Sequence, residues 1–197
     1  MYLCLEGIDG CGKDTQLKLL VNRLIAESQP VVSSYEPDDS TAIGKLLRQL
    51  LASGRHPEAI LPLFLADRAA SEPARARALA DGFHIVQARS FLSTIVYQGL
   101  KHPDGLLMLM HREMLHVWPD VIVVLDVTPK QAAERRRGRG KTDEVYERGD
   151  WQERVHARYA MTIKFKSMLN VPIVRVDGSG NAEEVHQRVW DVAKGYL

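Results

Sequence analysis

The glycine-rich segment Gly7–Lys13 constrains the fold of this chain more than any other feature. It has the spacing Gly-x-x-x-x-Gly-Lys and lies between an apolar segment, Tyr2–Leu5, and a segment, Leu17–Ile25, whose apolar residues recur at helical spacing. Strand, glycine-rich loop and helix in this order are typical of a phosphate-binding loop. The glycines allow backbone N–H groups to converge on a phosphate, and Lys13 adds a positive charge. A glycine-rich turn without a ligand is the alternative that this context disfavours.

The loop carries the residues that we expect to bind the phosphates of ATP. Asp14 departs from the usual pattern, because it stands where a serine or threonine hydroxyl usually reaches magnesium, and Thr15 follows it. If the Cys11 thiol is exposed, we expect it to react with thiol reagents and bound ATP to slow that reaction. The expected nucleotide-binding residues are Gly7, Asp9, Gly10, Cys11, Gly12, Lys13, Asp14 and Thr15.

Segments of strand type alternate with segments of helical type along the whole chain. The expected strands are residues 2–5, 30–34, 83–87, 121–127 and 172–176, and the longest expected helix is Pro57–Ala80. This alternation predicts a three-layer α/β fold of the P-loop NTPase type, in which helices cover both faces of a five-stranded parallel sheet. Residues 121–127 are the most apolar run, so we expect them at the centre of the sheet. No repeat or linker is evident, which predicts one domain over residues 1–197.

Composition excludes several other classes of protein. The net charge of +1 provides no overall basic field for nucleic acid or an anionic membrane. No apolar run reaches the roughly 18 residues of a transmembrane helix, and the N-terminus enters the first expected strand without a signal peptide. The 2 cysteines make a disulfide framework implausible, and the 7 histidines lack metal-ligand spacing. We therefore expect a cytoplasmic protein without nucleic-acid or membrane partners.

Four blocks of residues together resemble the thymidylate kinase family. They are Glu6–Lys13, Phe64-x-x-x-Arg68, Arg89-x-x-x-Ser93-Thr94-x-x-Tyr97-Gln98-Gly99 and Leu125–Pro129. Their order and joint spacing are similar to those of enzymes that transfer a phosphoryl group from ATP to dTMP, and the resemblance extends to the turn at residues 176–180. It implies a sheet of the nucleoside monophosphate kinase type, a mobile lid at about residues 135–149, magnesium dependence and a homodimer.

The resemblance assigns the base of the acceptor nucleotide to one helix face. Phe64 matches the aromatic ring that stacks on thymine, and Arg68 matches the guanidinium that reaches a base carbonyl. Residues four apart share a helix face, so an aromatic ring and a planar guanidinium can contact one base together. The alternative is that Phe64 belongs to the core and that Arg68 pairs with Asp67 or Glu72.

Further contacts to the acceptor follow from the same resemblance. Tyr97 matches the ring beside the 2′ position of the sugar, which favours deoxyribose, and Asp9 matches a carboxylate near the acceptor sugar and the metal. Arg89 matches the arginine that holds the acceptor phosphate, a task suited to a bidentate guanidinium. The complete set of expected acceptor-binding residues is Asp9, Glu36, Pro37, Phe64, Arg68, Arg89, Ser93, Thr94, Tyr97, Gln98 and Tyr146.

Two departures from the family pattern concern the acceptor phosphate. Ala88 stands where an aspartate usually precedes the arginine. The segment Glu36–Asp39 carries acids where basic residues are common, and Arg48 is the next cation along the chain. Asp38 and Asp39 at this point weaken the binding of a dianionic phosphate unless magnesium or Arg48 compensates. The departures leave the efficiency and the acceptor of the enzyme open.

The basic run at residues 135–141 resembles a lid that closes over the phosphates. In phosphoryl transfer, arginines that approach the reacting oxygens stabilise the transition state. Family members place a basic residue in the phosphate-binding loop or arginines in the lid, and Cys11 occupies the loop position here. We therefore assign catalysis to Arg137 and Arg139, together with Lys13, Arg89 and Asp9. The alternative is that this run is a solvated, charged helix end.

The resemblance also implies a magnesium site and a phosphoryl-transfer reaction. The candidate metal ligands are Asp9, Asp14, Thr15 and Glu147. The expected reaction is in-line transfer from ATP to a deoxynucleoside monophosphate, with dTMP as the preferred acceptor and dTDP as the product. Two alternatives are a kinase with broader or altered deoxynucleoside monophosphate specificity and a weakened homologue that binds nucleotide in a regulatory role.

Overall fold

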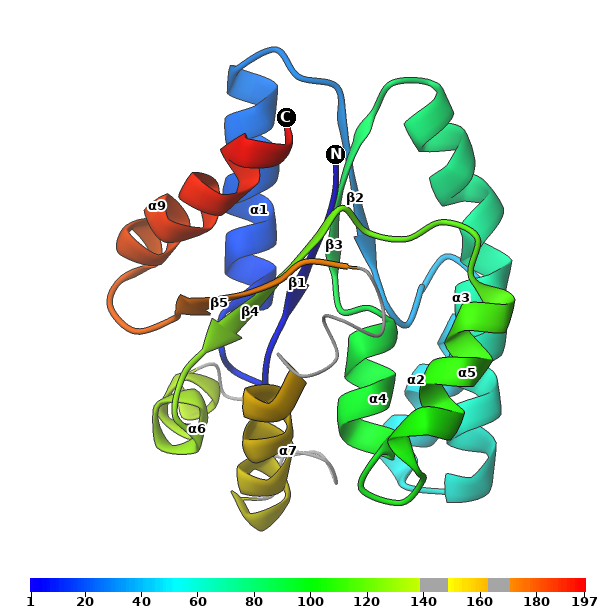
Figure 1. Cartoon of the computed structure of the whole chain (residues 1–197). Helices are drawn as coiled ribbons and strands as arrows, with labels where there is room; N and C mark the ends of the chain where they lie inside the picture. Colours follow the sequence, from blue (N-terminus) through cyan, green and yellow to red (C-terminus); the bar gives the residue numbers. More distant parts are fainter. Residues whose placement is uncertain (139–148, 163–170) are drawn as a thin grey trace.

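Five parallel strands form one sheet in the order β2-β3-β1-β4-β5 (Figure 1). The computed structural model describes residues 1–138, 149–162 and 171–197. Each strand coincides, within one or two residues, with a segment of strand type in the sequence, so the predicted parallel α/β fold is confirmed. The strands are β1 (Tyr2–Glu6), β2 (Val31–Tyr35), β3 (His84–Ala88), β4 (Val121–Asp126) and β5 (Ile173–Asp177).

Helices cover both faces of the sheet (Figure 1). On one face, α1 and α9 lie side by side, whereas α3, α4 and α5 lie on the other, and α6 and α7 stand near the carboxyl ends of the strands. The helices are α1 (Lys13–Ala26), α2 (Ala42–Ser53), α3 (Pro57–Ala80), α4 (Phe91–Gln98), α5 (Asp104–Met114), α6 (Pro129–Arg137), α7 (Gly149–Met161) and α9 (Ala182–Ala193), the last followed by a 3-10 turn at Lys194–Tyr196.

Local residues explain where the helices near the site begin. The hydroxyl of Thr41 accepts a hydrogen bond from the backbone N–H of Gly44 at the start of α2. Thr128 and Gln131 form a capping box at the start of α6. Ser90 caps α4 directly after β3, so the residue before it is held between a strand end and a helix start.

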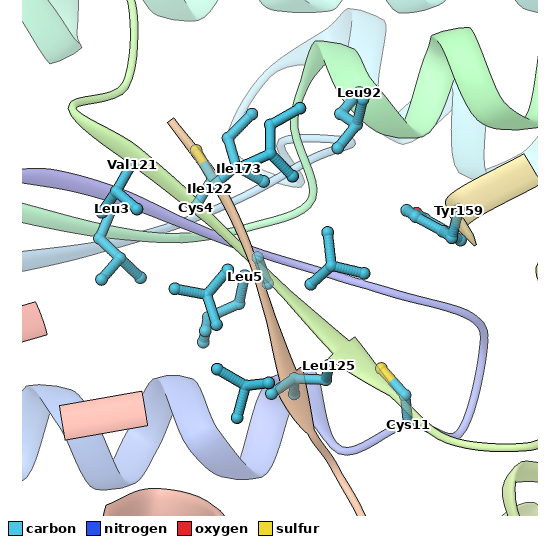
Figure 2. Packing of buried hydrophobic residues seen from close by; sticks show 14 of the residues in the cluster. Leu3, Cys4, Leu5, Cys11, Leu92, Val121, Ile122, Leu125, Tyr159 and Ile173 are labelled. Atoms are coloured by element: carbon cyan, nitrogen blue, oxygen red, sulfur yellow. The ribbon is translucent and has the colours of Figure 1, made fainter. Parts of the chain in front are cut away.

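The core is built around β1 and β4, which lie in the interior of the sheet. Leu3, Leu5, Val121 and Leu125 have at most 1% of their surface exposed, and they pack in one cluster (Figure 2). Interior parallel strands are covered on both faces, which explains why residues 121–127 form such an apolar run. No helix in the described ranges is long and apolar enough to cross a membrane.

The topology brings distant parts of the sequence to one edge of the sheet. Because all strands are parallel, the segments that follow β1, β2, β3 and β4 emerge at the same edge. The strand order reverses beside β1, and ligands of open α/β sheets bind at such a point. The glycine-rich loop, Glu36, Arg89 and the start of α6 therefore come together.

Candidate functional site

A pocket of about 350 Å³ opens at this edge of the sheet. Most of the expected site residues line it. They are Asp9, Gly10, Gly12, Lys13, Asp14, Glu36, Pro37, Phe64, Arg68, Arg89, Ser93, Tyr97 and Gln98. Gly7, Cys11, Thr15, Thr94 and Arg137 do not line it, and Arg139, Tyr146 and Glu147 lie outside the described residues.

The glycine-rich loop wraps around the amino group of Lys13. The Lys13 Nζ donates to the carbonyl oxygens of Gly7 at 2.8 Å and of Ile8 at 3.0 Å, and the residue is 7% exposed. Gly10 and Gly12 have φ values of 90° and 108°, in the left-handed region that favours glycine. A full charge and the N-terminus of α1 therefore face one concavity, which suits an anion.

The structure decides whether the Cys11 thiol is exposed. Its side chain is 1% exposed and belongs to the buried cluster (Figure 2), so the condition for ready reaction with thiol reagents is not met. Gly10 is the loop residue that faces α6, because a Cβ there would lie 2.4 Å from the Ala132 oxygen and 3.0 Å from Arg136 Cγ. The loop residue next to α6 is therefore Gly10 rather than Cys11, and it has no room for a side chain.

Arg89 and Asp9 form an ion pair in the pocket. The Tyr97 hydroxyl donates to Asp9 Oδ2 at 3.0 Å, and the Gln152 amide donates to the same oxygen at 3.4 Å. Burial alone would raise the pKa of the Asp9 carboxyl, but the charges of Arg89 and Lys13 outweigh it and hold the pKa below its usual value. Asp9 is therefore ionised at neutral pH and oriented by several partners.

Arg89 is also fixed through its backbone. Its φ of 69° is unusual for a residue with a side chain, and its N–H donates to the carbonyl oxygen of Leu5 at 2.9 Å. The Arg89 NH1 group donates to Ser93 Oγ at 3.3 Å. Such backbone conformations cost about 1–3 kcal/mol and cluster at functional sites. The strand end thus presents Arg89 in a defined direction.

Beneath this pair lies Glu6, a buried carboxylate that supports the site and that sequence reasoning did not single out. Its carboxylate is fully buried and accepts from the hydroxyls of Ser90 at 2.8 Å, Ser93 at 2.7 Å and Tyr159 at 2.7 Å. These bonds tie the segment after β3 and helix α7 to the end of β1. An ionisable residue that ends an apolar strand was the signal that could have identified it.

Two further residues that line the pocket, Arg68 and Glu36, form an ion pair. The Arg68 Nε donates to the two carboxylate oxygens at 3.1 Å and 3.0 Å, and both side chains are 4% exposed. Asp67 instead accepts from the backbone N–H of Asp38, and Glu72 accepts from backbone N–H groups at the end of α5. The alternative pairing of Arg68 with these neighbours is therefore not what the structure contains.

Two other residues of the pocket bear on the departures noted in the sequence. Ala88 lines the pocket, so the place of the missing aspartate faces the site. Arg48 of α2 also lines the pocket, where it pairs with Asp39 and donates to the Pro37 oxygen at 2.6 Å. The sequence named Arg48 only as a neighbouring cation. The fold brings it to the site because α2 packs on α3.

The three arginines at the end of α6 occupy different environments. Arg136 is 7% exposed, lines the pocket and donates to the backbone oxygen of Asp9 at 2.5 Å. Arg135 donates to the Cys11 oxygen at 3.1 Å and the Gly178 oxygen at 2.9 Å. Arg137 is exposed. Sequence reasoning missed Arg136, since a run of three arginines does not indicate which faces the site until the helix is placed.

Cations outnumber carboxylates among the described residues that line the pocket. The cations are Lys13, Arg48, Arg68, Arg89 and Arg136, and the carboxylates are Asp9, Asp14 and Glu36. A cleft with this balance attracts polyanions such as phosphates. Phe64, half-buried on the same wall as Arg68, adds an aromatic surface suited to a base.

Comparison with known proteins agrees with this chemistry. The family model described as thymidylate kinase matches residues 5–189. The chain is 32% identical to a thymidylate kinase of Fervidobacterium nodosum, with 100% of each chain covered. It is 35% identical to a thymidylate kinase of Synechococcus sp. strain JA-3-3Ab, covering 100% of this chain and 97% of the relative. A thymidylate kinase of Synechococcus sp. strain RCC307 is 36% identical, with 98% and 95% covered.

Proposed function

Since the chain belongs to the thymidylate kinase family, we propose that it transfers the γ-phosphoryl group of ATP to dTMP, forming dTDP and ADP. The observation that carries the proposal is one pocket that joins Lys13 and the glycine-rich loop to Arg89 and to the Phe64–Arg68 wall. A phosphate-binding loop alone supports only nucleotide binding. Arg89, which can hold a second phosphate, and the aromatic ring of Phe64 together support a nucleotide as the acceptor.

The geometry suggests a role for each part of the pocket. Backbone N–H groups of the loop and Lys13 hold the donor phosphates. Arg89, held by Asp9, fixes the acceptor phosphate, while Phe64 and Arg68 fix its base. The acceptor oxygen belongs to an ionised phosphate, so the reaction needs no strong general base. Arg136 reaches the loop from α6 and stabilises negative charge on the transferred group.

The pocket fits magnesium that arrives with ATP. No group of three or more histidine, cysteine or acidic side chains in the described parts of the chain could hold a metal. Magnesium commonly uses one or two carboxylates with substrate phosphates, and Asp9 and Asp14 in the pocket provide that number. Bound magnesium neutralises phosphate charge. Thr15 is exposed, and Glu147 lies outside the described residues.

A coupled ADP-release assay over dTMP, dUMP, dCMP, dGMP and UMP tests the proposal. We expect dTMP to be turned over faster than dGMP and UMP, because Phe64, Arg68 and Tyr97 match a thymine and a deoxyribose. Equal turnover of purine and thymine nucleotides would favour the altered-specificity kinase. ATP binding without turnover of any acceptor would favour the weakened homologue. A homodimer and a cytoplasmic location remain proposals from the family resemblance.

Phe64→Ala is expected to raise the KM for dTMP while the KM for ATP stays unchanged. Base–aromatic stacking is worth about 1–3 kcal/mol, which corresponds to roughly a 5- to 150-fold change in affinity. Steady-state kinetics with each substrate varied in turn measures both constants. Phe83→Ala is the matched control, because Phe83 is 38% exposed and precedes β3 at the opposite edge of the sheet. An unchanged KM for dTMP would contradict the stacking role.

Ala88→Asp is expected to raise kcat, most strongly at low magnesium. The new carboxylate would enter the pocket beside Arg89, where it can accept from magnesium-bound water. Supporting groups of this kind change metal affinity by about 10- to 100-fold, so the magnesium concentration for half-maximal rate should fall about tenfold. Ala88→Asn controls for size without charge. An unchanged or higher magnesium concentration for half-maximal rate would mean that the metal is held by another arrangement of residues, and that the catalytic residues need reassignment.

A further inference from the structure

Arg68 has an unusually complete set of hydrogen-bond partners for a residue that lines a binding pocket. Its guanidinium is nearly fully buried. The Nε–H and one N–H of NH2 donate to the Glu36 carboxylate, and NH2 lies 2.5 Å from Glu36 Oε2. The same NH2 group donates to Thr94 Oγ1 at 3.3 Å. Glu36 is held in turn by Gln87, whose amide donates to Oε1 at 3.1 Å. The Nε and NH2 side of the Arg68 guanidinium is therefore rigidly anchored.

His111, on helix α5, contacts the NH1 group of the Arg68 guanidinium. Its Nε2 lies 2.8 Å from Arg68 NH1, and its Nδ1 lies 2.6 Å from the carbonyl oxygen of Leu107. A carbonyl only accepts hydrogen bonds, so Nδ1 must carry the proton and Nε2 must accept from Arg68. Burial and the charge of Arg68 lower the pKa of His111 to about 3, which keeps the ring neutral at physiological pH.

We propose that His111 is a positioning residue for acceptor recognition, which fixes Arg68 so that a single N–H remains for the base. A guanidinium has five N–H groups. Glu36 takes two, Thr94 takes one and His111 takes one, which leaves one on NH1. This inference rests on the proposed function, because it assigns the remaining donor to a pyrimidine held against Phe64.

The single remaining N–H of Arg68 distinguishes bases by whether they present a hydrogen-bond acceptor or another donor to it. At the 4-position of a pyrimidine it can donate to the carbonyl oxygen of thymine or uracil, whereas cytosine carries there an amino group that is itself a donor and cannot accept from it. If the His111 acceptor is removed, both N–H groups of NH1 lack a protein acceptor. The second N–H can then recruit water or another acceptor atom of the base, and the preference for a carbonyl weakens. His111 thereby acts on specificity without touching the substrate.

The test compares His111→Phe with His111→Gln. Phenylalanine keeps a ring against Phe91, whose ring centre lies 5.9 Å from that of His111, but it cannot accept from Arg68. Glutamine has an acceptor oxygen at similar reach. For His111→Phe we expect the KM for dTMP to rise about tenfold with kcat within about twofold and an unchanged KM for ATP. The preference for dTMP over dCMP should fall, and His111→Gln should restore both values.

A spectroscopic measurement separates positioning from a general structural role. In ¹⁵N-histidine-labelled protein, His111 should show the Nδ1–H tautomer and should not titrate between pH 6 and 8, with His111→Gln identifying its signals. His116→Gln is the matched control for kinetics, because His116 is exposed at the end of the same helix. If His111→Phe does not fold, His111→Met replaces it as the variant without an acceptor.

The outcomes distinguish this inference from the proposed function. Wild-type protein that phosphorylates no deoxynucleoside monophosphate overturns both. Wild-type protein that prefers dTMP over dCMP, with folded His111→Phe retaining that preference and the KM for dTMP, overturns the role of His111 alone. An Nε2–H tautomer, or a ring that titrates near neutral pH, also overturns it. Loss of stability in the variant with unchanged specificity would indicate only a packing role.

Discussion

Arg89→Ala is expected to lower kcat/KM for dTMP by about a thousandfold, the largest effect of any single change proposed for this protein. Arg89 is the clamp for the acceptor phosphate, and it is held by Asp9, Ser93 and its own backbone. Alanine removes the guanidinium and leaves the Asp9 carboxylate without its ion-pair partner in the pocket. Two effects therefore add: the phosphate loses its anchor, and a negative charge faces it uncompensated.

Arg89→Lys separates charge from geometry. Lysine keeps a positive charge near Asp9 but cannot donate two parallel hydrogen bonds, so it should recover only part of the loss. Steady-state kinetics with dTMP varied at saturating ATP gives the comparison, and thermal denaturation confirms that each variant is folded. A loss below about tenfold in Arg89→Ala would show that another residue, with Arg48 as the first candidate, carries the acceptor phosphate.

Arg136→Ala is expected to lower kcat by about 100- to 1000-fold, with little change in either KM. Arg136 is buried against the glycine-rich loop, where its guanidinium donates to the Asp9 oxygen and lines the pocket. A group at this point can approach the transferred phosphoryl oxygens. Because charge builds on those oxygens in the transition state, removing the arginine should affect the rate more than ground-state binding.

Arg137→Ala is the matched comparison, since Arg137 is the next residue of the same helix and is exposed. The sequence alone favoured Arg137 and Arg139, and the structure adds Arg136 as a candidate. A large loss in Arg136→Ala with near wild-type rates in Arg137→Ala would assign the catalytic contribution of α6 to Arg136. The reverse pattern would return it to Arg137. Equal small losses would mean that this helix end carries only solvated charges.

Individual residues illustrate how far sequence reasoning reached. Phe64, Arg68 and Arg89 were identified from spacing and resemblance, and the fold brings all three to one pocket. Glu6 and His111 were not identified, because their importance depends on partners 87 and 43 residues away in the chain. Whether Cys11 is exposed could not be read from the sequence, since a motif does not state which side chains point inward, and the structure buries it.

The sequence by itself determined the parts that depend on local order. Alternating apolar periodicities fixed the parallel α/β architecture, and glycine spacing after the first strand fixed the phosphate-binding loop. Tertiary structure decided which charged side chains meet. Glu36 rather than Asp67 or Glu72 became the partner of Arg68, and Arg136 rather than Arg137 came to line the pocket. Sequence patterns are set by nearest neighbours along a helix or strand, whereas ion pairing depends on which elements the sheet topology brings within a few ångströms.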